Sequence, residues 1–312
     1  MAAFLVTGGA GFIGSHLTEE LVRRGERVRV LDNFLTGKRE NLAPLAGRFE
    51  LLEGDIRDRA VCERAVQGME VVLHQAALPS VPRSVEDPFT TNEINIGGTL
   101  NLLWAAARAG VRRFVFASSS SVYGDNPRLP KVEGSEGMPL SPYAVSKWVG
   151  EKFLQTFALT YGLSSVSLRY FNIFGPRQDP FSQYAAVVPL FITRILHGEP
   201  PTIYGNGEQS RDFTYVANVV EANLRAAETP GLAGQAVNIA CADRITVNAL
   251  VDRINLIVGA SVRPVYEPSR PGDIPHSFAD IGAARAILGY KPRISFDEGL
   301  RTTIAWYKER TP

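Results

Sequence analysis

The sequence predicts an α/β protein with a doubly wound parallel sheet and a smaller C-terminal α/β domain. Three observations lead to this fold class. Apolar strands alternate with amphipathic helices through the first half of the chain. Three glycines follow the first strand at a turn, and prolines and glycines cluster between short elements after Asn172. The sheet is therefore expected in the first part of the chain, with a cleft between it and the later segments.

The first glycine-rich turn predicts a dinucleotide site. Residues 4–6 form an apolar strand, and Gly8, Gly11 and Gly14 follow it and open a helix. Gly8 permits the tight turn, Gly11 lets the backbone approach a pyrophosphate, and Gly14 lets the helix pack closely on the strand. The helix N-terminus then offers free N–H groups and its positive dipole end to the phosphates. This is the Rossmann-type arrangement, and the alternative is a glycine-rich turn in an ordinary α/β protein.

The next strand ends at an acidic residue that favours one form of the cofactor. Residues 28–31 (Val-Arg-Val-Leu) are mainly apolar and form the predicted strand. Asp32 ends it, 18 residues after Gly14. A carboxylate at this place accepts hydrogen bonds from the adenosine ribose hydroxyls and repels a 2′-phosphate. NAD is therefore the expected cofactor.

The remaining elements are predicted from hydrophobic periodicity. Strands are expected at residues 49–55, 71–77, 114–117, 165–169, 202–204 and 236–240. Helices are expected at residues 59–66, 88–110, 142–161, 184–196, 217–228, 247–258 and 281–288.

Composition excludes several classes of function. The 312 residues carry a net charge of +1, which indicates neither a nucleic-acid nor a membrane-surface partner. Cys62 and Cys241 provide no disulfide framework, and the cysteines and four histidines have no metal-ligand spacing. No segment has the length of a transmembrane helix, and the N-terminus lacks a signal peptide. We therefore expect a cytoplasmic protein without a metal.

A second motif predicts proton transfer. Four serines, residues 118–121, follow the strand at 114–117, and Tyr143 and Lys147 lie four residues apart on one helix face. A free tyrosine has a pKa near 10, but a nearby ammonium and a positively charged nicotinamide both favour the phenolate. Such a group can remove the proton of an alcohol while hydride leaves its carbon. The alternative is a surface pair on a helix and a serine-rich loop.

With these two motifs, the chain resembles the extended short-chain dehydrogenase/reductases, and within them the UDP-hexose 4-epimerase family. It is most similar to the type that acts on UDP-N-acetylglucosamine, and the resemblance runs essentially from end to end. The further matching segments are residues 95–99, 169–172, 175–178, 210–212 and 270–273.

The resemblance implies roles for residues at matching positions. Ser119, Tyr143 and Lys147 match the catalytic serine, the base, and the lysine that binds the nicotinamide ribose. The implied NAD-binding residues are Gly8, Gly11, Phe12, Ile13, Gly14, Asp32, Asn33, Asp55, Ile56, Gln75, Ala76, Ala77, Tyr143, Lys147 and Tyr170. Asn95 matches a position behind the site, where a functional and a purely structural role are both open.

The implied UDP-sugar residues fall into two groups. Charged and polar side chains hold the UDP group, and two arginines suit a pyrophosphate because each offers paired donors. Small residues line the hexose site. The full set is Ser120, Ser121, Asn172, Gln178, Ala186, Val187, Thr202, Ile203, Tyr204, Arg211, Arg270, Asp273 and Ser277.

The resemblance also implies a domain division and an assembly. Residues 1–173 and 211–240 are expected to form the NAD-binding Rossmann domain, and residues 174–210 and 241–312 the UDP-sugar-binding domain. A homodimer is expected to pair the helices near 90–110 and 142–161 with their copies.

The implied reaction inverts carbon 4 of the sugar. Tyr143 takes the proton of the 4-hydroxyl while carbon 4 gives hydride to NAD⁺, and the 4-keto sugar turns before hydride returns to its other face. Dehydratases of related sequence carry Thr-Asp-Glu where residues 119–121 are serines, so water elimination lacks its acid–base pair here.

One position is expected to set the size of the accepted sugar. Ser277 is small and leaves room for a 2-acetamido group, and Gln178 and Ala186 match the same type of enzyme. Pro79 departs from that type, which has glycine there. UDP-GlcNAc and UDP-GalNAc are the expected substrates, and UDP-glucose and UDP-galactose stay open. Alternatives are a UDP-glucuronate 4-epimerase or decarboxylase, for which Arg177 could supply a cation, a simple dehydrogenase, and an NAD-sensing module without turnover.

Overall fold

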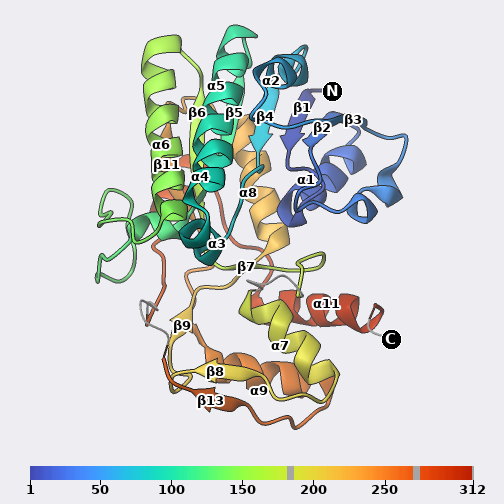
Figure 1. Ribbon diagram of the computed structural model, residues 1–312, viewed down its shortest axis with the longest axis vertical. Coiled ribbons are helices and arrows are strands. Elements are labelled where there is room, and N and C mark those ends of the chain that lie inside the picture. The colour runs from blue at the N-terminus through green and yellow to red at the C-terminus, as the bar shows by residue number, and fades with distance from the viewer. Residues whose placement is uncertain (181–185, 270–274, 311–312) are drawn as a thin grey trace.

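The computed structural model describes residues 1–180, 186–269 and 275–310 (Figure 1). Its larger layer is a seven-stranded sheet in the order β11-β6-β5-β4-β1-β2-β3, and all its pairings are parallel. The strands are β1 (Ala3–Thr7), β2 (Arg27–Asp32), β3 (Glu50–Glu53), β4 (Val71–His74), β5 (Arg113–Ser119), β6 (Ser165–Tyr170) and β11 (Gln235–Ile239). The chain reverses its direction of winding between β1 and β4, which confirms the predicted doubly wound sheet.

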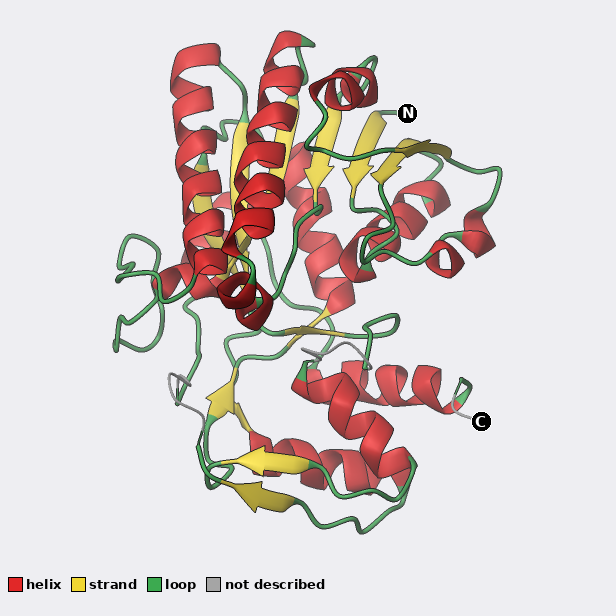
Figure 2. Cartoon of the chain, in the orientation of Figure 1, coloured by secondary structure: helices red, strands yellow, loops and turns green. Residues whose placement is uncertain are grey.

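Helices cover both faces of the sheet, as Figure 2 shows in red against the yellow strands. One apolar cluster joins the sheet to α1 (Phe12–Arg23), α8 (Val216–Glu228) and α10 (Gly282–Leu288). A second joins the other face to α2 (Arg59–Val66), α5 (Thr99–Arg108) and α6 (Pro142–Tyr161). Along β1, Phe4 and Val6 point into the first cluster and Ala3 and Leu5 into the second. Alternate side chains of a strand face opposite sides, so both faces are apolar.

A smaller layer lies beyond the carboxyl ends of the strands (Figure 1). Its apolar cluster packs α7 (Val187–Leu196), α9 (Val247–Val258) and α11 (Phe296–Lys308) against one another, with Phe174 and Phe213 between them. Three two-stranded pairs accompany these helices. They are β7 (Ile173–Phe174) with β10 (Thr214–Tyr215), β9 (Ser210–Arg211) with β12 (Ile245–Thr246), and β8 (Thr202–Tyr204) with β13 (Val265–Glu267).

Helix α6 shows how local sequence sets an element that carries the candidate site. Ser141 is its N-cap and accepts a hydrogen bond from the Ala144 N–H at 3.1 Å. Pro142 occupies the first helical position, where no N–H is needed. Gly162 ends the helix in the left-handed conformation at φ +67°. The helix therefore begins one residue before Tyr143.

Several predicted boundaries shift. The helix expected at residues 88–110 is α4 (Pro88–Asn92), a π-helical turn at Glu93–Gly98 and then α5, and the strand expected to reach residue 77 ends at His74. Strand β5 extends through Ser118 and Ser119 because both pair with β6. The elements that were not predicted include α3 (Val81–Glu86), α11, the 3₁₀ turn at Ser120–Tyr123 and the short strands β7, β9, β10, β12 and β13. Two further 3₁₀ turns lie at Arg39–Asn41 and Ala43–Leu45.

The described residues contain neither a membrane-spanning helix nor a cluster of metal ligands. Among them, no helix is both long and apolar enough to cross a membrane. Within the same part of the chain, no cluster of three or more His, Cys, Asp or Glu residues could hold a metal ion.

Candidate active site

The glycine turn lies between β1 and α1, where the winding of the sheet reverses. Gly8 has φ +66°, and a β-carbon there would lie 2.8 Å from the Ala76 nitrogen. A β-carbon on Gly14 would lie 2.1 Å from the Gly8 carbonyl oxygen. The Gly11 N–H donates to that same oxygen at 3.0 Å. Larger residues would open this cradle, which has the shape that a pyrophosphate on a helix N-terminus requires.

Phe12 and Ile13 are the first two residues of α1, immediately after the turn, so their backbone N–H groups belong to its unpaired first turn.

The Asp32 side chain holds the glycine turn against β2. Its carboxylate accepts from the Ala10 N–H at 2.8 Å and, through its other oxygen, from the Phe34 N–H at 2.8 Å. Burial raises the pKa of Asp32, and these backbone donors oppose that effect. Each carboxylate oxygen can accept a second hydrogen bond, so Asp32 keeps acceptor capacity for a ribose.

A second acidic group lies beside Asp32 at the end of β3. Asp55 accepts from the Asn33 amide at 2.8 Å and pairs with Arg57 at 2.8 Å. The hydrogen bond from Arg57 is the main reason that the pKa of Asp55 falls to about 2. Asp55 is therefore ionised at neutral pH. The next residue, Ile56, is buried against Gly98.

Three of the predicted NAD-binding residues, Gln75, Ala76 and Ala77, directly follow β4. Ala76 follows β4 with its N–H 3.3 Å from the Thr7 hydroxyl, and Ala77 is the next residue. Gln75 lies 3.3 Å from the Tyr170 hydroxyl, which in turn accepts from the Asn223 amide at 2.8 Å. These contacts join the ends of β4 and β6 to α8. Asn223 was not predicted, because its contact depends on how α8 crosses the sheet.

The structure brings together the three predicted catalytic residues. Ser119 ends β5, Tyr143 lies in the first turn of α6, and Lys147 follows one turn later. Ser119 lies close enough to the Tyr143 hydroxyl to lower the pKa of the phenol. The Lys147 Nζ lies 5.9 Å from the centre of the Tyr143 ring and donates to the Ala117 carbonyl at 2.8 Å.

Electrostatics at this pair differ from the expectation in one respect. Burial raises the pKa of Tyr143, and the hydrogen bond with Ser119 opposes it. Burial also lowers the pKa of Lys147 to about 7. In the protein alone, the desolvation of both groups therefore outweighs the expected effect of the ammonium on the phenol. Lys147 can gain or lose a proton near neutral pH.

Several predicted substrate residues follow the carboxyl ends of β5 and β6 in the chain. The hydroxyl of Ser121 and the Oε1 of Gln178 are buried and have no hydrogen-bond partner within the described ranges. Ser120 lies between Ser119 and Ser121 in the 3₁₀ turn. Asn172 has φ +40° and donates through its amide to the Asp212 carbonyl at 3.2 Å. Unpaired buried polar atoms are costly, so Ser121 and Gln178 fit a polar ligand.

The other predicted substrate residues come from the smaller layer. Arg211 donates to the Ser210 and Pro275 carbonyls, and the Ser277 N–H donates to the Ser210 carbonyl at 2.9 Å. Ala186 and Val187 begin α7, and Thr202, Ile203 and Tyr204 form β8. The Ile203 side chain is buried in the apolar cluster, so only its backbone can face a ligand. Arg270 and Asp273 lie outside the described residues.

One residue of the site region, Glu151, went unrecognised in the sequence although a signal was present, and the role of another, Asn95, was left open. Glu151 follows Lys147 by four residues and so shares its helix face. Asn95 was left open, and it is buried with its amide on the Leu78 carbonyl and the Ser146 hydroxyl. Ser146 in turn donates to the Tyr143 carbonyl at 2.8 Å. These contacts favour a positioning role for Asn95.

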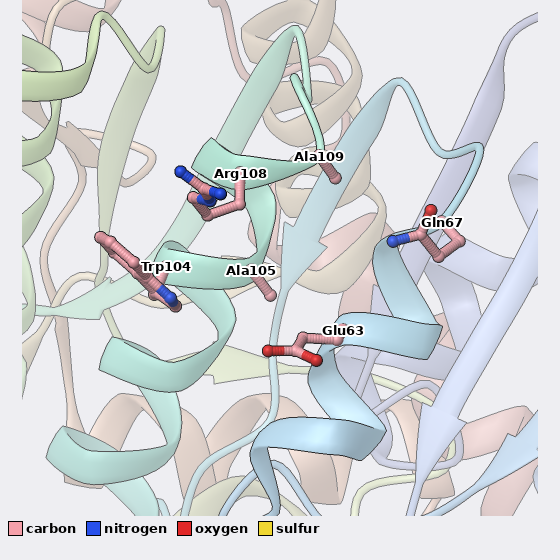
Figure 3. Close-up of a pocket in the computed structure, with 6 residues that line it drawn as sticks. All are labelled: Glu63, Gln67, Trp104, Ala105, Arg108 and Ala109. Atoms are coloured by element: carbon pink, nitrogen blue, oxygen red, sulfur yellow. The ribbon is translucent and has the colours of Figure 1, made fainter.

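A surface hollow lies apart from this centre. Figure 3 shows it between α2 and α5, with Glu63 and Gln67 on one side and Trp104 and Arg108 on the other. Its lining residues belong to the second half of α2 and the second half of α5 or directly follow these helices. A second hollow, lined mainly by apolar side chains, lies between α4 and the first turn of α6.

The fold and site define an NAD-binding protein of the short-chain dehydrogenase/reductase type. The model of the NAD dependent epimerase/dehydratase family matches residues 4–240. The chain belongs to this family, and NAD is the family's cofactor. The glycine cradle and the acceptor oxygens of Asp32 fit that cofactor.

The proteins similar to this chain include the following three. A putative UDP-glucose 4-epimerase of Methanocaldococcus jannaschii is 40% identical over 97% of this chain and 98% of its own. The structure of UDP-N-acetylglucosamine 4-epimerase from Methanobrevibacter ruminantium, in complex with UDP-N-acetylmuramic acid, has 42% identity and a TM-score of 0.95 over 99% of both chains. The structure of UDP-glucose 4-epimerase from Thermotoga maritima with UDP-glucose has 40% identity and a TM-score of 0.94 over 99% of both chains.

The glycine cradle yields the first prediction. Gly14→Ala places a methyl group where the Gly8 oxygen lies 2.1 Å away, so the turn must open and NAD affinity should fall about a hundredfold. The measurement is titration of the purified protein with NAD by calorimetry, after circular dichroism shows that the variant is folded. Gly97→Ala is the matched control, because a β-carbon there has nothing within 4 Å. Unchanged affinity in Gly14→Ala would contradict the cofactor assignment.

Proposed function

We propose that this protein is a UDP-hexose 4-epimerase that uses NAD and acts on UDP-GlcNAc and UDP-GalNAc, with UDP-glucose and UDP-galactose as further substrates. The observation that carries the proposal is the grouping of Ser119, Tyr143 and Lys147 at the carboxyl end of β5, beside the glycine turn. The likeness to enzymes named for UDP-GlcNAc and for UDP-glucose supports the substrate class.

Each catalytic residue then has a chemical task. Tyr143, as phenolate, accepts the proton of the sugar 4-hydroxyl, and the Ser119 hydroxyl donates a hydrogen bond to the reacting oxygen. Bound NAD supplies the acceptor and donor of hydride for carbon 4. Lys147 holds the nicotinamide ribose, and as an ammonium it stabilises the phenolate. After the 4-keto sugar has rotated to present its other face, Tyr143 returns the proton to the oxygen on carbon 4.

The UDP group is the part that must stay fixed during this turn. Arg211 supplies a guanidinium for the pyrophosphate together with Arg270, and Asp273 accepts from the uridine ribose. Asn172 and the edge of β8 complete the nucleotide side. The hexose meets small groups, Ser120, Ser121 and Ser277, which leave it free to rotate.

The arrangement of one arginine favours a hexose over a hexuronate. Arg177 is the cation that would be available to the carboxylate of UDP-glucuronate. It forms an ion pair with Glu19 of α1, and its side chain is only 16% exposed. Glu19 thus offsets the charge of Arg177, although the Arg177 Nη1 is buried without a hydrogen-bond partner among the described residues. On this ion pair we place the glucuronate epimerase second.

Three of the apolar clusters support the proposed domain division, and a smaller fourth one joins Tyr123 and Phe171 to Ala279 and Ile281 across it. The first two lie on the two faces of the seven-stranded sheet, and the third belongs to α7, α9 and α11. We assign residues 1–173 and 211–240 to the NAD-binding domain and residues 174–210 and 241–312 to the UDP-sugar domain. Helix α10 returns from the second segment to pack on the sheet.

Exposed apolar side chains support a homodimer through α5 and α6. Trp104 is 42% exposed on α5 and contacts the Tyr161 ring of α6 edge-on at 5.8 Å. Val145, Trp148 and Leu159 are exposed along α6. A second copy of this face would cover a continuous apolar surface of the kind that marks an interface.

Tyr143 is tested by removing its hydroxyl. Tyr143→Phe should lower turnover about a thousandfold while NAD still binds, because only the proton acceptor is lost. The measurement is NMR of UDP-GlcNAc, UDP-glucose and UDP-glucuronate incubated separately with the protein. Tyr161→Phe, on the same helix but exposed at its far end, is the control. Unchanged turnover in Tyr143→Phe would overturn the assignment of Tyr143 as the base. Absence of turnover in the natural protein would support the NAD-sensing alternative, and net NADH formation would support a simple dehydrogenase.

The size of residue 277 is tested by enlarging it. Ser277→Tyr should lower kcat/KM for UDP-GlcNAc about thirtyfold, because the ring fills the space of the acetamido group. Activity on UDP-glucose should change less than about threefold. Ser277→Ala keeps the position small and should leave both values near those of the natural protein. Equal losses for both sugars in Ser277→Tyr would refute the size argument.

The dimer is tested at Trp104. Trp104→Glu places a charge in the proposed interface and should convert a dimer to a monomer in sedimentation equilibrium. Leu256→Glu, on the exposed face of α9, is the control and should leave the mass unchanged. A natural protein that sediments as a monomer would contradict the proposed assembly.

A further inference from the structure

A buried ion network lies directly behind the candidate catalytic residues. Its centre is Arg169 on β6, which is 3% exposed. The guanidinium donates to both oxygens of Glu151, at 2.8 and 2.7 Å, and also pairs with Glu136. Glu151 is fully buried on α6, one turn after Lys147. One cation is therefore shared by two carboxylates from different parts of the chain.

The helix side of the network reaches the serine strand. Glu151 accepts from the Ser118 hydroxyl at 2.6 Å, and Ser118 precedes Ser119 on β5. Arg169 itself precedes Tyr170, which belongs to the predicted cofactor site. Glu151 and Arg169 thus join β5, β6 and α6, the three elements that carry Ser119, Tyr170 and Tyr143. Charge-assisted, two-pronged contacts of this kind fix geometry as well as adding stability.

The loop side reaches the chain between Gly124 and Ser141. Glu136 belongs to this loop, and its side chain is 20% exposed. Burial raises the pKa of Glu136, but the charge of Arg169, two backbone N–H donors and the hydrogen bond from Arg169 together outweigh burial and lower the pKa, so the ion pair holds at neutral pH. Arg169 also donates to the Tyr123 hydroxyl at 3.0 Å, and Tyr123 donates to Asn238 at 2.7 Å. Asn238 in turn donates to the Lys131 carbonyl of the same loop at 3.0 Å.

The loop is bonded in turn to the segment that holds Ser277. The Lys131 N–H donates to the Phe278 carbonyl at 2.7 Å, and the Asp280 N–H donates to the Lys131 carbonyl at 2.9 Å. On its other edge the segment is held by the bond from the Ser277 N–H to Ser210. The short backbone run at 276–280 therefore lies between β9 and the loop, with bonds to both.

We infer that Arg169 is a positioning residue that fixes the base helix α6 against the loop at 124–141 and, through that loop, against the backbone of Ser277. The inference rests on the proposed function for its kinetic consequence but not for its structural one. Glu151 sets the place of Tyr143 and Ser119, and Glu136 sets the wall of the sugar pocket. Glu151, at one end of the network, then acts on proton transfer, and Glu136, at the other end, acts on sugar binding.

The test compares the two carboxylates. Glu136→Gln keeps the size of the side chain and leaves Glu151 to pair with Arg169, so the variant retains the internal ion pair. It should raise KM for UDP-GlcNAc about tenfold, the worth of one charge-assisted contact, with kcat within about twofold. Glu151→Gln should instead lower kcat about tenfold, because the proton-transfer geometry loosens. Glu50→Gln is the matched control. Glu50 lies on β3 and is the exposed partner of Arg29 on β2, so this variant should change neither KM nor kcat.

Hydrogen–deuterium exchange gives a readout that needs no activity. In Glu136→Gln, the amides of residues 125–138 and 276–280 should exchange about tenfold faster than in Glu50→Gln, while those of β1 and α1 should not change. Unchanged exchange in these two segments would overturn the inference. So would equal losses of kcat in Glu136→Gln and Glu151→Gln at unchanged KM. A natural protein inactive on all UDP-hexoses would refute the proposed function, and the exchange result would still decide the positioning role.

Discussion

Parallel register is the constraint on which the candidate site depends. Thr7 pairs with Leu31 and with His74, and Ser119 pairs with Tyr170, so the strands end at one edge. Residues that follow these ends in sequence, from Gly8 to Tyr170, are then neighbours in space although more than a hundred residues separate them. A shift of one residue in any pairing would turn the same side chains to the opposite face of the sheet. The apolar clusters on both faces hold the register, because such a shift would expose them.

Features set by short-range spacing could be predicted from the sequence. The glycine turn, Asp32 and the Tyr143–Lys147 pair each depend on residues within one strand–helix unit, and the structure places all of them at the carboxyl edge. Helix α11 also had a local signal that was overlooked, since Ser295 caps it by accepting from the Glu298 N–H at 3.3 Å. In this case the information was present and the prediction was incomplete.

Features set by chain crossing could not be predicted in this way. The two-residue strands β9 and β12 are too short to have a periodicity, and only the packing of the smaller layer brings them together. Asn223 reaches Tyr170 because α8 lies across β6, and Glu136 reaches Arg169 because a long loop folds back. The spacing of Tyr143 and Lys147 led us to expect a lowered pKa for Tyr143, but burial raises it. That rise could not be predicted from spacing, since it depends on how far burial removes Tyr143 and Lys147 from water.

Helix α6 treats its two buried charges differently, and the difference matches their tasks. Glu151 is met by both donors of the Arg169 fork and by Ser118, so the cost of removing its charge from water is offset by strong contacts. Lys147 has a neutral partner, the Ala117 carbonyl, and burial lowers its pKa to about 7. Three hydrogen bonds therefore hold the Glu151 side chain in one position. A group compensated as weakly as Lys147 can change its protonation near neutral pH. The helix thus carries a fixed anchor one turn away from a buried lysine whose protonation can change near neutral pH.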